Sequence, residues 1–162
     1  MCLYVDDLIY TWNNFGMFER FKQSMMLEFD MADLGKMHYF LCIKVVQSKA
    51  GILISQKKYV QEILNKFQMS NCNRAAIPTE VGLKLVRNSD EKKVDSHLYK
   101  QIVGSLMYLT GTRPDIMHVV CLISRYMENP KESHLLVAKR ILRYLRGTTI
   151  NFLQEGKKFR SD

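Results

Sequence analysis

The segment that most constrains the fold is Tyr4-Val5-Asp6-Asp7, near the amino end of the sequence. Strand-forming residues flank the two aspartates, so residues 2–11 are predicted to form a tight β-hairpin with Asp6 and Asp7 between its strands. Adjacent carboxylates repel each other, and a divalent cation or strong hydrogen bonds would relieve that repulsion. Oxygen ligands on a rigid turn suit Mg²⁺. The same residues also fit an ordinary polar turn, so the motif alone leaves both interpretations open.

The sequence after the hairpin predicts a mixed α+β chain. A helix capped by Asn13 or Asn14 is expected to follow, because aromatic and apolar residues recur there at helical spacing. These residues are Phe18, Phe21, Met25 and Phe29. Two strands are expected over residues 37–47 and 52–56, with a turn at Ala50-Gly51.

A second helix is expected after Ser55, which is placed to cap it, and its apolar stripe comprises Val60, Ile63, Leu64 and Phe67. Residues 68–96 are polar and without a clean period, and we interpret them as a long connection. Three helices are predicted beyond it, over about residues 96–110, 114–127 and 131–146, and the first is expected to turn Tyr99, Ile102, Val103 and Leu106 inward. Gly147 is the expected C-cap of the last helix.

Length and charge limit the function classes. The chain has 162 residues, the usual size of one domain, and no apolar run approaches the roughly 20 residues of a membrane helix. The amino end does not resemble a signal peptide, and the four cysteines lack metal-site spacing, so we expect reduced thiols in an intracellular protein. Residues 1–34 contain six acids against two bases, whereas residues 131–162 contain eight bases against three acids. That distribution suits a protein that holds cations at one end and a polyanion at the other, although an uneven solvated surface is also common.

Five long stretches resemble, in order and spacing, the reverse transcriptase of copia-type LTR retrotransposons. The resemblance extends from about residue 2 to residue 149. The stretches are LYVDDLIYT, EFDMADLGKMHYFLCIKV, ILISQKKYVQEIL, LYKQIVGSLMYLTGTRPDIMHVVCLISRYM and HLLVAKRILRYLRGT. The family is an RNA-directed DNA polymerase that copies an RNA template from a DNA primer with dNTPs.

The resemblance implies roles for residues of the hairpin. Asp6 and Asp7 match the two palm aspartates of the family's Y-x-D-D motif, which are catalytic and bind Mg²⁺ or Mn²⁺. Tyr4 and Val5 match residues that line the nucleotide and the primer end. In a two-metal site of this kind, one ion activates the attacking 3′-hydroxyl and both neutralise charge on the transferring phosphate.

The resemblance also implies a domain organisation. Residues 1–67 match the C-terminal part of the palm, including the primer-grip hairpin at Phe40, Leu41 and Cys42. Residues 68–95 are then a connecting loop. Residues 96–149 match the helical thumb and connection. Residues 150–162 form a divergent tail where ribonuclease H would follow.

The last predicted helix has two chemically different faces. On a helical wheel an apolar face comprises Ala138, Ile141, Leu142 and Leu145, and an adjacent basic face comprises Lys139, Arg140, Arg143 and Arg146. A helix that packs by one face and presents bases on the next is suited to contact a phosphate backbone. A solvated basic face without a ligand is the alternative.

Four departures from the family pattern predict a loss of activity. The family's fingers and a third metal-binding aspartate lie upstream of the Y-x-D-D hairpin, and this sequence starts three residues before that motif. Cys42 replaces the glycine of the primer grip, Trp12 replaces a small residue, and residues 150–162 diverge. These changes are typical of a decayed copy. We therefore expect weak or absent metal binding and no polymerase activity from this chain alone.

Two other interpretations remain open at this stage. The chain is alternatively a non-catalytic remnant that binds nucleic acid through its basic helices, or an interaction partner for a fuller polymerase. Without the family's upstream half, we also expect an unpaired sheet edge and exposed apolar surface, with aggregation or independent folding of the helical part alone.

Overall fold

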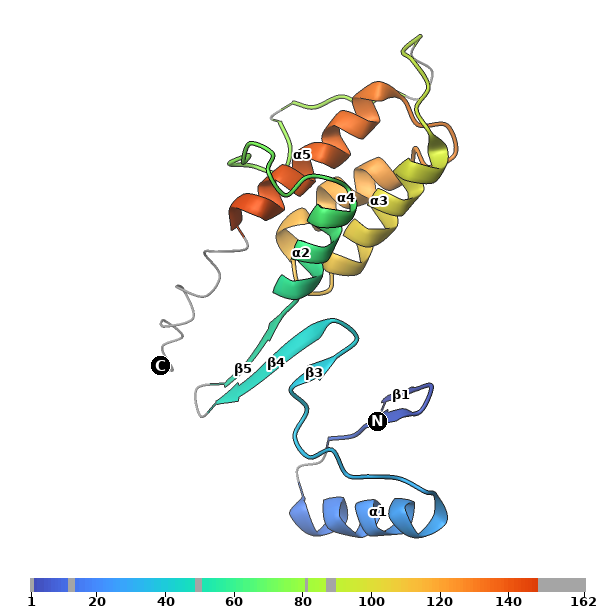
Figure 1. The fold of residues 1–162 in the computed structure, drawn as a ribbon, viewed down its shortest axis with the longest axis vertical. Helices are drawn as coiled ribbons and strands as arrows, with labels where there is room; N and C mark the ends of the chain where they lie inside the picture. Colours follow the sequence, from blue (N-terminus) through green and yellow to red (C-terminus); the bar gives the residue numbers. More distant parts are fainter. Residues whose placement is uncertain (1, 12–13, 49–50, 81, 87–89, 149–162) are drawn as a thin grey trace. The chain divides into compact units, whose positions relative to one another are not determined.

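The computed structural model describes residues 2–11, 14–48, 51–80, 82–86 and 90–148, in two units that divide after Phe40. Figure 1 shows the element order, which is mixed α and β as predicted, with five α-helices, a short 3₁₀ helix and five strands in the described residues. Trp12, Asn13 and the tail from Thr149 onward lie outside the described residues.

The first unit begins with the expected hairpin. Strands β1 (Cys2–Tyr4) and β2 (Asp7–Ile9) pair antiparallel, with Tyr4 opposite Asp7. Tyr10 follows β2, and its ring lies 4.9 Å from that of Phe18 and 5.1 Å from that of Phe21. These aromatic contacts join the hairpin to the next helix.

Helix α1 (Phe15–Glu28) starts as predicted at Asn14, whose Oδ1 accepts a hydrogen bond from the backbone N–H of Met17 at 3.2 Å. An ion pair of 2.7 Å between Lys22 and Asp33 joins the helix to the segment that leads to β3 (Tyr39–Phe40). No side chain is fully buried among the described residues of this unit, and Phe29 is 55% exposed. The predicted apolar stripe is therefore only partly covered.

The second unit begins with a hairpin and a helix. Strands β4 (Ile43–Ser48) and β5 (Gly51–Ser55) pair antiparallel from Lys44 opposite Ser55 to Ser48 opposite Gly51. Helix α2 (Lys57–Lys66) follows directly. The prediction that Ser55 caps α2 is wrong, because Ser55 remains paired in β5 and Gln56 occupies the cap position without a side-chain cap.

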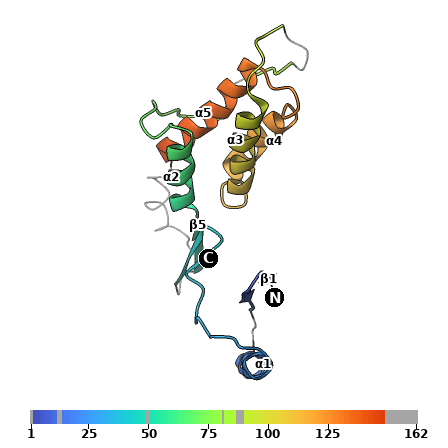
Figure 2. The ribbon, with the colours of Figure 1, turned by 45° about the vertical axis from the view of Figure 1, so that its right-hand side comes forward.

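Helices α3 (Ser96–Leu109), α4 (Met117–Ser124) and α5 (Glu132–Thr148) pack with α2 around one core, as the two views in Figures 1 and 2 show. A 3₁₀ helix, η1 (Pro114–Ile116), precedes α4. The predicted inward residues of α3 are confirmed, as are those of α5: Tyr99, Ile102, Val103, Leu106, Ala138, Ile141, Leu142 and Leu145 are all buried. The described residues between 68 and 95 are largely irregular, as predicted.

The end of α5 differs from the prediction. The helix continues through Gly147 to Thr148 instead of ending there. A Cβ on Gly147 would lie 3.5 Å from the Cβ of Arg74 and 3.6 Å from the carbonyl oxygen of Ala75. The glycine therefore lies where the segment after α2 passes close to α5, and this tertiary contact explains its position better than capping does.

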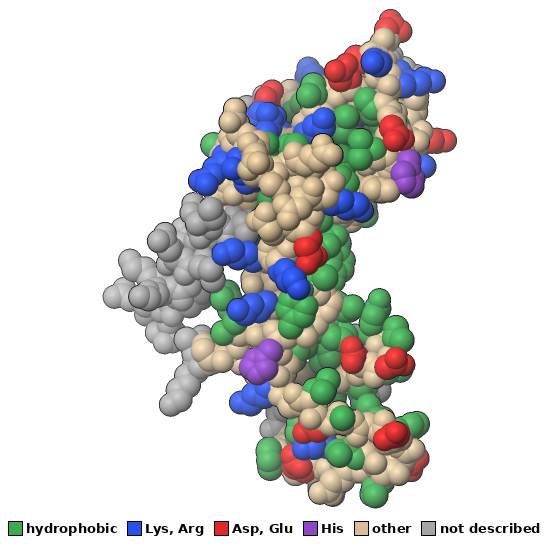
Figure 3. Space-filling model, in the orientation of Figure 1, with side chains coloured by type: hydrophobic (Ala, Val, Ile, Leu, Met, Phe, Trp, Pro, Cys, Tyr) green, Lys and Arg blue, Asp and Glu red, His purple; other side chains and the backbone are tan. Residues whose placement is uncertain are grey.

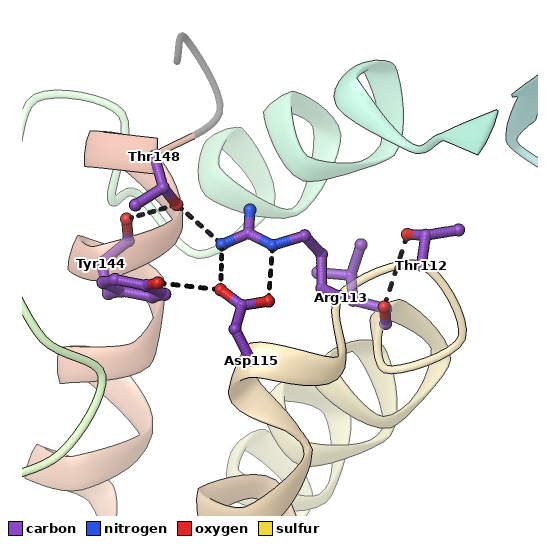
Figure 4. A network of polar contacts seen from close by, with 6 residues as sticks. Thr112, Arg113, Asp115, Tyr144 and Thr148 are labelled. Atoms are coloured by element: carbon purple, nitrogen blue, oxygen red, sulfur yellow. Dashed lines mark hydrogen bonds and ion pairs between the residues drawn. The ribbon is translucent and has the colours of Figure 1, made fainter. Parts of the chain in front are cut away.

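A buried arginine fixes this end of α5 (Figure 4). The guanidinium of Arg113 donates to both oxygens of Asp115, at 2.9 and 2.6 Å, and to Thr148 Oγ1 at 2.8 Å. The hydroxyl of Tyr144 also donates to Asp115, at 2.8 Å. Burial alone would raise the pKa of Asp115, but these hydrogen bonds outweigh it and hold the pKa below its ordinary value. The network connects the loop after α3 to the last turns of α5.

Candidate functional site

The acidic hairpin forms a tight turn, shifted by one residue from the prediction. Val5 and Asp6 are the turn residues, whereas Asp7 is the first residue of β2. Val5 has a φ of 51°, a left-handed conformation that a β-branched residue rarely adopts. Such backbone strain persists only where the surrounding structure requires it, and it is concentrated at functional sites.

The side chains of this hairpin are open to solvent. Asp6 and Asp7 are exposed, as are Tyr4 (51%) and Val5 (76%). Because Tyr4 and Asp7 are directly opposite in the register, their side chains share one face of the hairpin. This arrangement leaves the carboxylate of Asp7 accessible beside an aromatic ring.

The hairpin lies next to a residue of the predicted primer grip. The ring centroids of Tyr4 and Phe40 are 6.2 Å apart, with an edge-to-face angle of 84°. These residues are 36 positions apart in the sequence, so tertiary structure alone places them together. The acidic hairpin and Phe40 of the predicted primer grip thus meet within the first unit.

The other two residues of the predicted primer grip form a two-residue turn. Leu41 and Cys42 have φ values of 45° and 61°, so both adopt the left-handed conformation that tight hairpin turns require. Cys42 therefore occupies a position that favours glycine, the residue expected there from the family pattern. The carbonyl oxygen of Leu41 accepts a hydrogen bond from the hydroxyl of Tyr108 in α3.

Potential metal ligands do not form large clusters in the described residues. Nowhere in that part of the chain do three or more His, Cys, Asp or Glu side chains come together in a way that would hold a metal ion. Asp6 and Asp7 are thus two carboxylates without a third partner of these types among the described residues. Mg²⁺ is often held by only one or two carboxylates together with water and substrate phosphates.

The basic residues of α5 separate into two environments. Arg140 pairs with Glu80 at 2.6 Å, and Arg143 contacts the same segment, because its carbonyl oxygen accepts from the N–H of Ala75 at 3.4 Å. Lys139 instead lines a groove of about 290 Å³ whose wall also contains Lys66. Figure 3 shows many Lys and Arg side chains on the viewed face of the second unit.

Sequence patterns missed several polar residues that the fold brings together. Arg113 and Asp115 are two positions apart, but their partners Tyr144 and Thr148 are about 30 positions away. Gln56 is similarly buried, and its Oε1 accepts from Thr112 at 2.7 Å. No short motif signals the long-range pairs, because they form only where the loop after α3 packs against α5 and against the start of α2.

A family model described as reverse transcriptase (RNA-dependent DNA polymerase) matches residues 1–81, which include the acidic hairpin and the Leu41-Cys42 turn. The chain belongs to this reverse transcriptase family. The resemblance to copia-type retrotransposons is confirmed by two relatives, each called a retrovirus-related Pol polyprotein: from transposon TNT 1-94 of Nicotiana tabacum and from transposon RE1 of Arabidopsis thaliana. Each is 37% identical to this chain over 158 residues, covering 92% and 96% of it.

The chain matches only part of these Pol polyproteins, because it spans 12% of the first and 11% of the second. An uncharacterized mitochondrial protein of Arabidopsis thaliana, AtMg00810, is 36% identical over 154 residues, which cover 94% of this chain and 63% of that protein. No solved structure matches the chain. In the described part of the chain, none of the helices combines the length and the apolar character that crossing a membrane would need.

Proposed function

We propose that this chain contributes the two-aspartate hairpin of an RNA-directed DNA polymerase. The observation that supports this most directly is the strained, exposed turn at Val5-Asp6, with Asp7 beside it and the ring of Tyr4 against that of Phe40. Membership of the reverse transcriptase family supports the same assignment. Asp6 and Asp7 would be the catalytic and metal-binding residues, with Tyr4 and Val5 next to the nucleotide and the primer end.

The proposal assigns a role to each part of the chain. Residues 1–67 would form part of a polymerase palm, with Phe40, Leu41 and Cys42 as its primer grip. Residues 68–95 would connect it to a helical thumb over residues 96–149. The substrates would be an RNA template, a DNA primer and dNTPs. Bound Mg²⁺ or Mn²⁺ would neutralise charge on the transferring phosphate.

Metal binding by the hairpin is directly testable. We expect weak Mn²⁺ binding, with a Kd on the order of millimolar, because two exposed carboxylates are few ligands for the ion. Electron paramagnetic resonance of free Mn²⁺ during a titration measures this binding. Asp6→Asn and Asp7→Asn should each weaken it severalfold, whereas Asp30→Asn, which removes another exposed acid of the same unit, should not. Equal effects of all three substitutions would contradict the assignment.

We expect no measurable polymerase activity from the 162-residue chain by itself. Losing one positioned ligand of a metal pair removes on the order of several kcal/mol of transition-state stabilisation. Primer extension on an RNA template, with Mg²⁺ or Mn²⁺, measures the activity. Templated incorporation that disappears with Asp6→Ala would overturn this expectation.

A non-catalytic role in nucleic-acid binding is the second candidate function. It is favoured by the four bases on α5, namely Lys139, Arg140, Arg143 and Arg146. Backbone contacts of this kind weaken steeply with salt. Fluorescence anisotropy with a labelled oligonucleotide should show weak binding at low salt that falls with Lys139→Gln and Arg143→Gln. An affinity that does not change with salt or with these substitutions would rule out this role.

A further inference from the structure

The segment of residues 74–80 lies along the basic part of α5. The N–H of Ala75 donates to the carbonyl oxygen of Arg143 at 3.4 Å, and Arg74 approaches Gly147 closely. At the other end of the segment, Glu80 Oε1 lies 2.6 Å from Arg140 Nη1. One stretch of chain thus contacts α5 over about two turns, although 60 residues separate Glu80 from Arg140.

This contact leaves several polar atoms buried without a partner. Within the described residues, Arg140 Nε, Arg143 Nε and Thr79 Oγ1 are covered from solvent and make no hydrogen bond. A guanidinium is best satisfied when two oxygens of one anion accept from Nε and Nη together, which carboxylates and phosphates can both do. Glu80 reaches only Nη1 of Arg140, so the pairing is incomplete.

The partner of Arg140 is also the more exposed member of the pair. The side chain of Glu80 is 66% exposed, against 25% for Arg140. An exposed carboxylate is held weakly, since solvent and salt screen the attraction. Glu80 can therefore exchange its contact with Arg140 for solvent more readily than the less exposed Arg140 can.

We propose that Glu80 is a built-in competitor for nucleic acid, because its carboxylate occupies the donor of Arg140 that a backbone phosphate would use. The inference rests on the nucleic-acid binding proposed for α5. A phosphodiester must displace Glu80 to reach Arg140, whereas Lys139, in the groove beside Lys66, is available without such a step. Residues 74–80 thus lower the affinity of α5 for nucleic acid, because the phosphate backbone must first displace Glu80.

Fluorescence anisotropy with a labelled single-stranded oligonucleotide at about 50 mM salt tests this inference. Glu80→Gln should tighten binding by roughly three- to tenfold, and the slope of log K against log salt should steepen by about 0.7, since one more phosphate is contacted. Glu62→Gln is the matched control, because it removes an exposed acid from α2 with the same change in net charge. It should change the affinity less than twofold.

A double-mutant cycle separates competition at Arg140 from a general charge effect. In the Arg140→Gln background, Glu80→Gln should have no further effect, since the donor that it releases is absent. An equal gain in both backgrounds, or equal gains from Glu80→Gln and Glu62→Gln, would overturn the inference while leaving nucleic-acid binding intact. If neither the natural chain nor Glu80→Gln binds at low salt, both proposals fail together. Circular dichroism of each variant verifies that the helices are retained.

Discussion

The two units of this chain differ in how they bury their side chains. The first unit joins a hairpin to α1 through a few aromatic contacts, and none of its described side chains is fully buried. The second unit packs α2, α3, α4 and α5 around one continuous core and also buries Arg113 and His134. The acidic turn therefore belongs to the unit in which no described side chain is fully buried. The basic helix α5 belongs to the unit with a continuous hydrophobic core. The two proposed roles therefore depend on folding to different degrees.

The largest expected effect comes from removing core volume in the second unit. Leu142→Ala should lower the free energy of unfolding by about 2–5 kcal/mol, because Leu142 is completely buried. Phe18→Ala in α1 should cost much less, since Phe18 is only partly buried. Chemical denaturation followed by circular dichroism measures both. Comparable losses of stability from the two substitutions would contradict the difference in burial between the units.

A somewhat smaller effect is expected at the buried arginine. Asp115→Asn should destabilise the second unit by about 1–3 kcal/mol, because it removes the carboxylate charge that pairs with the buried guanidinium of Arg113 at 2.6 Å. The control is Asp90→Asn, which neutralises an exposed acid in the segment before α3. Thermal unfolding of the two variants should separate them, and an unchanged Tm for Asp115→Asn would contradict the role given to the network in Figure 4.

A third prediction concerns the strained turn of the first unit. Val5→Gly should stabilise the hairpin by about 0.5–1 kcal/mol, because glycine adopts a positive φ without steric cost. Hydrogen exchange of the amides in β1 and β2 should slow as a result. Leu3→Gly, in a strand and not in the turn, should instead speed exchange.

The last prediction concerns the pH dependence of stability in the second unit, which involves His134 near the amino end of α5. The imidazole of His134 is fully buried: its Nδ1 accepts from the N–H of Lys131 at 3.0 Å, and its Nε2 lies 3.2 Å from the carbonyl oxygen of Val86. Burial lowers the pKa of His134 below its ordinary 6.5, and the charge of Lys131 adds to this, although the hydrogen bond to Val86 and the charge of Glu91 oppose it. The ring also stacks on Tyr126 at 3.9 Å.

Since the pKa of His134 is lower in the folded state, the unfolded chain takes up a proton first. Its contribution to stability is complete above about pH 6.5 and is lost as the pH falls toward the folded-state value. Urea unfolding between pH 7.5 and 5 should show this decline in the second unit, and His134→Asn should flatten it. His97, which is exposed, is the control for substitution of a histidine by asparagine. If the loss of stability at low pH persists in His134→Asn, another titrating group causes it.

Local patterns were sufficient for most of the elements. The spacing of Tyr99, Ile102 and Leu106 fixed the inner face of α3 before its neighbours were known, because a helix with one apolar stripe has one way to bury it. The position of the acidic hairpin was predicted to within one residue. Element ends were less well predicted: Ser55 and Gly147 have residue types typical of caps, yet a strand pairing and a close tertiary contact determine their actual positions.

Sequence patterns were enough to predict the family, the order of the elements, the acidic turn and the basic face of the last helix, because each of these is encoded in neighbouring residues or in a single helical period. Only the tertiary structure placed Tyr4 against Phe40, Arg113 between Asp115 and Thr148, and Glu80 on Arg140. Those pairs are up to 60 residues apart, and their contacts exist only once the backbone has folded. Side-chain chemistry shows which partners a residue accepts, but packing decides which partner comes within reach.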